Sequence, residues 1–203
     1  TAIFDENTER LQQMASKYDV QAVDSLDALF ATNPNWVYIG TPPVSHASLA
    51  SEAAKRGFNV LCEKPLAHDA ADAEAMVEAA KHVTTAMHFP MMYSPVVARL
   101  KKAVQRGELG DILRIELHTH FPVWPRPWQQ NPWIATREQG GFIREIFPHY
   151  LQLTHHIFGD VVIDAHATQY PANEAFCETA VSALMHTARG IPMFINGVAG
   201  IAQ

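Results

Sequence analysis

One short apolar run that ends in a charged pair and a proline constrains the fold more than any other part of the chain. Residues 58–62 read Phe-Asn-Val-Leu-Cys, which is typical of a buried parallel strand, and Glu63, Lys64 and Pro65 follow directly. Because a residue before proline avoids the helical region, Lys64 is expected to project from the strand end. Ligands bind at the carboxyl ends of strands in open α/β sheets. On the tripeptide alone, an exposed Glu-Lys pair ahead of a helix is the simpler interpretation.

A second strand and turn, one crossover earlier, reverse that preference. Residues 36–46 form an apolar strand, a Pro-rich turn and the start of an alanine-rich helix. The whole stretch, VYIGTPPVSHASLASEAAKRGFNVLCEKPLA, resembles the nicotinamide-dependent oxidoreductases of the glucose-fructose oxidoreductase and inositol dehydrogenase (Gfo/Idh/MocA) family. By this resemblance, the cofactor contacts in this part of the chain are Thr41, Pro42, His46, Glu63 and Lys64.

Strands and helices alternate through the first part of the chain, which predicts a parallel sheet with right-handed crossovers. Strands are expected at residues 2–4, 36–39, 58–62 and 83–87, with helices between them. One of these helices covers residues 46–56 and ends at Gly57, a usual helix stop. The fold class is therefore α/β, and residues 1–90 are expected to form a partial Rossmann-type dinucleotide-binding domain.

The pattern changes from about His88 onward. Alternation over residues 112–120 predicts a half-exposed antiparallel strand, and a helical stretch is expected at residues 141–158. Three further strands are predicted at residues 161–167, 176–186 and 192–198. We therefore expect a partial α+β domain with a mostly antiparallel sheet at residues 91–203, for substrate binding and oligomerisation. By resemblance, the exposed face of this sheet is a subunit interface, and the protein is expected to be a homo-oligomer, either a dimer or a tetramer.

The sequence contains no GxGxxG turn, which a dinucleotide-binding domain carries after its first strand. Asp5 stands where the family places the acidic residue that binds the adenosine ribose. The resemblance thus implies a fragment that lacks the N-terminal glycine-rich turn and the C-terminal end. An acid at this position should bind the ribose 2′-hydroxyl and repel a 2′-phosphate, so NAD is expected as the cofactor and NADP is less favoured.

A second chemical motif lies in the predicted helix at residues 141–158. Glu145 and His149 are four positions apart, which places them on one helical face. The stretch GGFIREIFPHYLQL resembles the family pattern of glycines followed by Asp-x-x-x-His, with Glu145 replacing the aspartate. We assign His149 as general base and Lys64 as the group that stabilises alkoxide charge, while Glu145 orients His149 or accepts a hydroxyl. Pro148 implies that the helix either begins near this residue or is kinked there.

A Pro/Trp-rich loop at residues 121–139 is too long for a simple connector and is a candidate binding loop. Its aromatic and cationic side chains would form a platform for a sugar or aromatic substrate, or would only bury against the second domain or another subunit. The platform candidates are Trp124, Trp128, Trp133, Arg126 and Arg137, and Tyr93 is a further predicted substrate contact. Met91 and Met92 stand where the family often has paired arginines, which makes an acidic sugar less attractive as the substrate.

Composition excludes several classes of partner. A formal net charge of −6 gives no reason to expect nucleic acid or an anionic membrane, and no apolar run has the length of a membrane span. Cys62 and Cys177 are too few for a disulfide framework and fall in predicted strands. With no signal peptide recognisable, they are expected to be reduced core thiols of a cytoplasmic protein.

Two other functional classes remain open at this point. The 11 histidines raise the question of a metal site, but no HExxH or CxxC spacing occurs, so none is expected. The expected enzyme is an NAD(P)-dependent dehydrogenase that acts on a secondary alcohol of a sugar, polyol or related diol. Its alternatives are an NAD-using glycosidase of the same family, and a non-catalytic sensor or partner protein that kept the fold.

Overall fold

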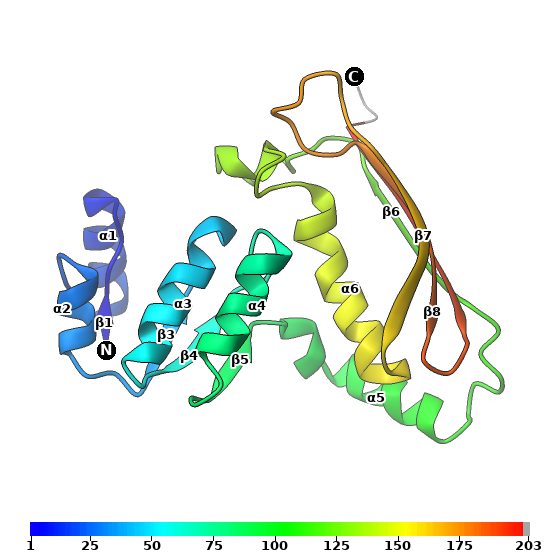
Figure 1. Cartoon of the computed structure of the whole chain (residues 1–203), viewed down its shortest axis with the longest axis horizontal. Helices are drawn as coiled ribbons and strands as arrows, with labels where there is room; N and C mark the ends of the chain where they lie inside the picture. Colours follow the sequence, from blue (N-terminus) through cyan, green and yellow to red (C-terminus); the bar gives the residue numbers. More distant parts are fainter. Residues whose placement is uncertain (201–203) are drawn as a thin grey trace.

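The first half of the chain folds as helices laid against short parallel strands (Figure 1). This computed structural model describes residues 1–200, so residues 201–203 of the predicted second domain lie outside the described residues. The elements in chain order are β1 (Ala2–Ile3), α1 (Thr8–Tyr18), β2 (Gln21–Ala22), α2 (Leu26–Ala31), β3 (Trp36–Ile39), η1 (Pro43–Ser45), α3 (His46–Lys55), β4 (Asn59–Cys62), α4 (Ala70–Ala79) and β5 (Thr85–Met87).

The strands of this half pair in parallel, as the alternation predicted. They form two separate sheets among the described residues: β1 pairs with β2, and β3, β4 and β5 form the other in that order. The short strand β2 was not predicted, because two residues are too few to show a period. Local signals placed the helices: the Ser25 hydroxyl accepts the Ala28 N–H at the start of α2, and Gly57 follows α3 with φ +84°.

One face of the larger sheet packs against α3 and forms the first core. The buried side chains there are Phe30, Val37, Ile39, Ala47, Ala50, Ala53, Val60, Cys62 and Met76. The opposite face is more open, since Trp36 and Tyr38 of β3 are 47% and 58% exposed. The run predicted as a buried strand therefore has one fully buried face, formed by Val60 and Cys62, while Leu61 on the other side is half-buried.

The second half places a long helix on a four-stranded sheet (Figure 1). Its elements are η2 (Pro90–Tyr93), α5 (Pro95–Gln105), β6 (Ile115–Phe121), η3 (Pro132–Ala135), α6 (Phe142–Phe158), β7 (Val161–Gln169), β8 (Ala180–Thr187) and β9 (Pro192–Ala199). None of the helices within residues 1–200 has the length and apolar character that a membrane crossing requires.

The sheet has the order β6-β9-β8-β7 and is mixed. β8 is antiparallel to both neighbours, but β6 pairs in parallel with β9, so the predicted antiparallel direction of the strand over residues 112–120 is wrong. Alternation of apolar and polar residues reports which face of a strand is buried and carries no information about the direction of the neighbour. The mostly antiparallel character of the sheet is nevertheless confirmed.

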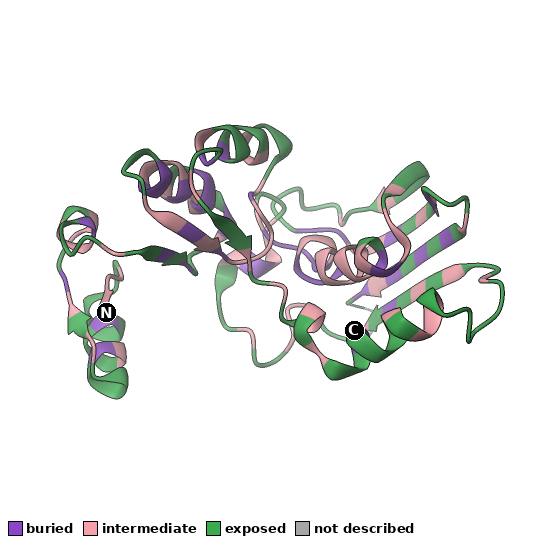
Figure 2. Ribbon diagram, turned by 90° about the horizontal axis from the view of Figure 1, so that it is seen from below, coloured by how far each residue is buried: buried purple, intermediate pink, exposed green. Residues whose placement is uncertain are grey.

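Helix α6 buries its apolar side against this sheet and forms the second core (Figure 2). Phe142 is fully buried, and a Cβ atom added to Gly197 of β9 would lie 2.6 Å from the Phe142 ring. A glycine is needed there because the helix and the strand approach each other so closely. This contact fixes the first turn of α6, which carries Glu145, at a set height above the sheet.

Candidate active site

The strands β3, β4 and β5 end in register, so the residues after them lie side by side. Glu63 follows β4, and its Oε1 accepts hydrogen bonds from the Tyr38 hydroxyl at 2.7 Å and from the His88 Nδ1 at 2.6 Å. Burial acts to raise the pKa of Glu63, but these two hydrogen bonds, together with the electrostatic effect of His88 and the Lys64 backbone N–H, lower it overall. Burial and the bond to Glu63 raise the pKa of Tyr38 to about 12. The Glu63 carboxylate is thus fixed by hydrogen bonds at the strand ends.

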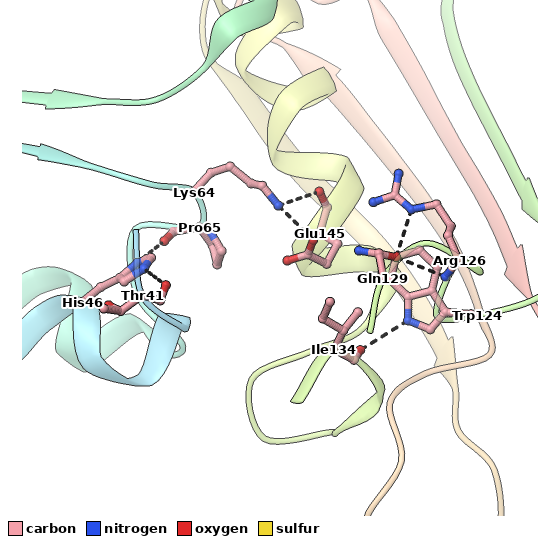
Figure 3. Close-up of polar contacts among 9 residues, drawn as sticks. All are labelled: Thr41, His46, Lys64, Pro65, Trp124, Arg126, Gln129, Ile134 and Glu145. Atoms are coloured by element: carbon pink, nitrogen blue, oxygen red, sulfur yellow. Dashed lines mark hydrogen bonds and ion pairs between the residues drawn. The ribbon is translucent and has the colours of Figure 1, made fainter. Parts of the chain in front are cut away.

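Lys64 projects from the end of β4 and reaches helix α6 (Figure 3). Its Nζ donates to the Glu145 carboxylate at 3.0 Å and to the Glu145 backbone carbonyl at 3.2 Å. The two side chains are only 15% and 8% exposed. The structure therefore brings together the two motifs that the sequence identified separately, and it does so through a largely buried ion pair.

His149 lies one helical turn after Glu145, and its ring sits edge-on to Phe89 with the centroids 5.9 Å apart. Its pKa is lowered, chiefly by burial and next by the nearby Lys64 charge. The Nδ1 atom is buried and has no hydrogen-bond partner among residues 1–200. Helix α6 begins at Phe142 and continues through Pro148, so it does not begin near the proline.

The predicted partnership between Glu145 and His149 takes a different form from the one expected. No hydrogen bond joins the two side chains within the described residues; the carboxylate turns to Lys64 instead. Helical spacing predicted the shared face, but only the position of β4 decides which neighbour the carboxylate meets.

A cleft of about 390 Å³ opens beside these three residues. The side chains that line it come from both halves of the chain: Lys64, Met91, Arg126, Trp128, Glu145, Ile146, His149 and Tyr150. Of the predicted substrate-binding and platform residues, the cleft lining includes Trp128 and Arg126. It does not include Trp133, Tyr93 or Arg137; Tyr93 is 85% exposed on η2, and Arg137 stacks on Tyr170 with 3.9 Å to the ring centroid.

The turn after β3 is tied to the Lys64-Pro65 turn by one buried histidine (Figure 3). The His46 Nδ1 lies 2.9 Å from the Pro65 carbonyl oxygen, and its Nε2 lies 2.8 Å from the Thr41 carbonyl oxygen. Both ring nitrogens are therefore occupied by the backbone, which leaves neither free for a ligand. The Thr41 hydroxyl oxygen accepts a bond from Ser45, and Pro42 leads into η1.

Asp5 is the second residue after β1 and borders a second hollow of about 410 Å³. One carboxylate oxygen accepts the Asn7 N–H at 2.8 Å, and the other pairs with the Arg10 Nε at 2.9 Å. An acid at the end of a parallel strand fits the ribose of a dinucleotide. Glu63 and Lys64 at the strand end, and the His149 Nδ1, which has no hydrogen-bond partner within residues 1–200, fit the nicotinamide end. The described residues thus fit such a cofactor at both of its ends.

Several residues at this site had no assigned role in the sequence reasoning. His88 could have been found from the strand ends, since it follows β5 as Glu63 follows β4. Tyr38 belongs to a strand that reads as apolar, and Tyr150 carries no motif. Met91 was identified only as a residue that stands where the family often has an arginine. Arg126 was considered only as part of an aromatic platform.

One cluster of possible metal-ligating groups occurs in the described residues, and it lies away from the cleft lining. His68, Asp69 and Asp72 stand at the start of α4, with their ligand atoms within 4.8 Å of one another. Asp69 caps this helix, since its carboxylate accepts the Asp72 N–H at 2.8 Å. The His68 Nδ1 lies 3.2 Å from the Asp72 carboxylate, and its Nε2 lies 3.5 Å from the Asp69 carboxylate.

Two family models together match most of the chain. Residues 1–89 match the model described as oxidoreductase family, NAD-binding Rossmann fold, and residues 97–198 match the GFO/IDH/MocA C-terminal domain. The first matched range ends shortly after β5 and the second begins within α5, so the unmatched residues 90–96 lie where the fold passes from the parallel strands to the second half.

Curated relatives and solved structures agree with these matches. D-apiose dehydrogenase of Paraburkholderia graminis is 28% identical over 92% of this chain and 50% of its own length. Inositol 2-dehydrogenase of Rhizobium meliloti is 23% identical over 88% of this chain and 54% of its own. The WlbA dehydrogenase of Bordetella pertussis, solved with NADH and UDP-GlcNAcA, superposes with a TM-score of 0.84 at 24% identity, over 99% of this chain and 59% of that one. The chain thus spans about half the length of the curated relatives it matches.

Proposed function

Because the chain belongs to the GFO/IDH/MocA oxidoreductase family, we propose that the protein is an NAD-dependent dehydrogenase that oxidises a secondary alcohol of a sugar, polyol or related diol. The observation that carries the proposal is the convergence of Lys64 with Glu145 beside the half-buried His149 in one cleft. A proton acceptor and a fixed cation beside the reacting hydroxyl are the two groups that alcohol oxidation requires of the protein.

His149 takes the hydroxyl proton in this proposal. Its lowered pKa keeps the imidazole neutral at neutral pH, so a ring nitrogen has a lone pair available for the proton. When the alcohol is oxidised, the O–H proton passes to His149, the hydride leaves the carbinol carbon, and a ketone remains. NAD supplies the hydride acceptor, the nicotinamide C4, when it is bound. In the reverse direction, the protonated ring returns the proton to the carbonyl oxygen.

Lys64 stabilises the developing negative charge on the substrate oxygen. An ammonium has three N–H donors, and two of them are used by the Glu145 carboxylate and carbonyl. One donor remains for the substrate, and the two existing bonds fix its direction. Glu145 is therefore a positioning residue, which holds the ammonium in place and balances its charge in a mostly buried setting.

The cofactor is held by groups at two strand ends in the proposal. Asp5 would bind the adenosine ribose, and Glu63 would lie near the nicotinamide, with Thr41 and Pro42 in the adjoining turn. His46 keeps this turn against the Lys64-Pro65 turn through its two carbonyl contacts. The acid at position 5 supports NAD over NADP, because a 2′-phosphate would face a carboxylate.

A homo-oligomer is part of the proposal. The sheet face opposite α6 is exposed, and its large apolar side chains include Val162, Leu184 and Phe194. A second copy that covers this face would remove these side chains from water. The two cysteines are free and buried, which supports a reducing compartment and hence the cytoplasm.

The test is a substrate screen on the full-length protein, with NADH formation measured for panels of sugars and polyols. His149→Asn and Lys64→Met should each lower kcat by about 10²- to 10⁴-fold while the dissociation constant for NAD changes little. His155→Asn, on the exposed side of the same helix, and Lys81→Met, on the surface, are the matched controls. Near-normal turnover in both cleft variants would contradict the catalytic assignment.

A further inference from the structure

Arg126 lines the same cleft as Lys64, Glu145 and His149, although it comes from the loop between β6 and α6. The proposed alcohol oxidation gives this guanidinium no task. Met91 and Met92 replace the paired arginines that the family often has, and the loss of those two positive charges made an acidic substrate less attractive. Arg126 places a positive charge in the cleft from a different part of the chain.

The Arg126 side chain is held on three sides. Its guanidinium carbon lies 4.4 Å from the Trp128 ring centroid and 5.5 Å from that of Trp124. The Gln129 Oε1 accepts both the Arg126 backbone N–H at 3.1 Å and the Nε–H at 3.0 Å (Figure 3). Trp124 is fixed in turn, since its indole N–H donates to the Ile134 carbonyl at 3.3 Å. A guanidinium held in this way loses little freedom when it binds a ligand.

Its two terminal nitrogens remain available. Arginine has five N–H donors, and the Gln129 contact uses only the one on Nε. Among residues 1–200 no carboxylate pairs with Arg126, although most of the other arginines in this range have an acidic or carbonyl partner. The unused terminal edge is the part of the side chain that binds carboxylates in a fork.

The charges in the cleft lining do not cancel. The Lys64 ammonium is balanced by Glu145 at 3.0 Å, and the lowered pKa of His149 leaves its ring neutral at neutral pH. Arg126 therefore contributes one uncompensated positive charge. A ligand with one negative charge would neutralise the cleft, whereas a phosphate dianion would leave one negative charge over.

We propose that Arg126 is a specificity residue and that the natural substrate carries a single carboxylate, as in a uronate or an aldonate, which binds the terminal edge of this guanidinium. This inference rests on the proposed function and names its substrate class. The two tryptophans hold the guanidinium, while the reacting hydroxyl lies beside His149 and Lys64 in the same cleft.

The experiment compares matched substrates on the full-length protein. D-glucuronate is paired with D-glucose, D-galacturonate with D-galactose, and D-gluconate with D-sorbitol, and kcat/KM for NADH formation is measured for each. At least one acid should be preferred over its neutral partner. Arg126→Gln should lower that preference by about 10- to 100-fold, the range for a lost hydrogen bond to a charged group, mainly through KM. Arg99→Gln, on the exposed surface of α5, should leave the preference unchanged.

Two contrary outcomes separate the inference from the function it rests on. Preference for neutral sugars or for glucose 6-phosphate, unaffected by Arg126→Gln, would overturn the carboxylate inference while the dehydrogenase survives. If no substrate yields NADH, the proposed function fails, and binding decides the inference alone: D-glucuronate should change the tryptophan fluorescence of the wild-type protein and not of Arg126→Gln. Equal responses in both proteins would overturn it.

Discussion

The Lys64 ammonium lies 3.0 Å from the Glu145 carboxylate across a separation of 81 positions in the chain. Each side chain is mostly shielded from water, so each depends on the other for its charge. This pair is also the link between the strand end of the first half and the helix of the second.

Removal of one partner should therefore cost stability as well as activity. We expect Lys64→Met to lower the free energy of unfolding by about 3–5 kcal/mol, because it leaves the Glu145 carboxylate buried without a cation. The double variant Lys64→Met/Glu145→Gln should recover most of this loss and remain inactive. Urea unfolding of the wild type, the single variant and the double variant measures these free energies. A double variant less stable than Lys64→Met would contradict the pairing.

The pH dependence of alcohol oxidation should reflect His149. Its folded-state pKa lies below the ordinary value of 6.5, so the basic form is present at neutral pH. We expect kcat/KM to be constant near neutral pH and to fall only below pH 6.5. Once the ring is protonated, kcat/KM should fall by about tenfold per pH unit. The unfolded chain binds the proton more readily, so this residue's effect also lowers stability as the pH falls below 6.5. An acid limb centred above 6.5 would contradict the assignment.

Cofactor preference should depend on Asp5 and Arg10. In the wild type, the Arg10 Nε is 2.9 Å from Asp5 and is neutralised by it. Asp5→Ser removes the charge that repels a 2′-phosphate and frees the guanidinium to bind one, so the ratio of kcat/KM for NADP to that for NAD should rise by about 10- to 100-fold. The control is Asp19→Ser, which removes a carboxylate at the C-terminal end of α1, the helix that carries Arg10. An unchanged ratio would remove Asp5 from the cofactor site.

The two thiols should be unreactive in the folded protein. Burial raises the pKa of Cys62 to about 12 and that of Cys177 to about 11, and the thiolate is the reactive form. Cys177 falls within the strand predicted at residues 176–186, but the observed strand β8 begins only at Ala180, so Cys177 lies ahead of it and is nevertheless buried. Alkylation by iodoacetamide should be negligible until the protein is unfolded in urea, when both should react. Rapid modification of the native protein would show that one of them is accessible.

Chelation should leave dehydrogenase activity unchanged. The proposed reaction uses Lys64 for charge stabilisation, and the cluster at His68, Asp69 and Asp72 is not part of the cleft lining. Prolonged dialysis against EDTA, followed by measurement of NADH formation, checks this. A loss that added zinc restores, and that His68→Asn also causes, would require a metal in the mechanism.

Much of the fold could be predicted because the local signals agree with each other. Gly57, Ser25 and the apolar runs of β3 and β4 mark boundaries that tertiary contacts then keep. The direction of β6 could not be predicted, because its partner β9 is the last strand of the described chain, and a strand's own residues say nothing about a neighbour so distant.

The site divides in a similar way. Lys64, Glu145 and His149 could be identified because each stands in a motif that resembles the family. Arg126 was predicted as part of the aromatic platform, but its place beside His149 could not be predicted, because it depends on how the long loop folds over Trp124 and Gln129. Likewise, the bonds of Glu63 to Tyr38 and His88 follow from the register of three strands, which no single segment encodes.

The parallel pairing of β6 with β9 also sets an order of events during folding. The loop that delivers Arg126 starts at the end of β6, and β6 has no sheet neighbour among the described residues other than β9. At that end of β6, the Phe121 carbonyl oxygen accepts a hydrogen bond from the Gly200 N–H, with 2.9 Å between nitrogen and oxygen. Such a long-range contact closes late. Until β9 pairs with β6, the loop that carries Arg126 starts from a strand with no described neighbour, so this side of the cleft and the β6-β9 pair are expected to become ordered together.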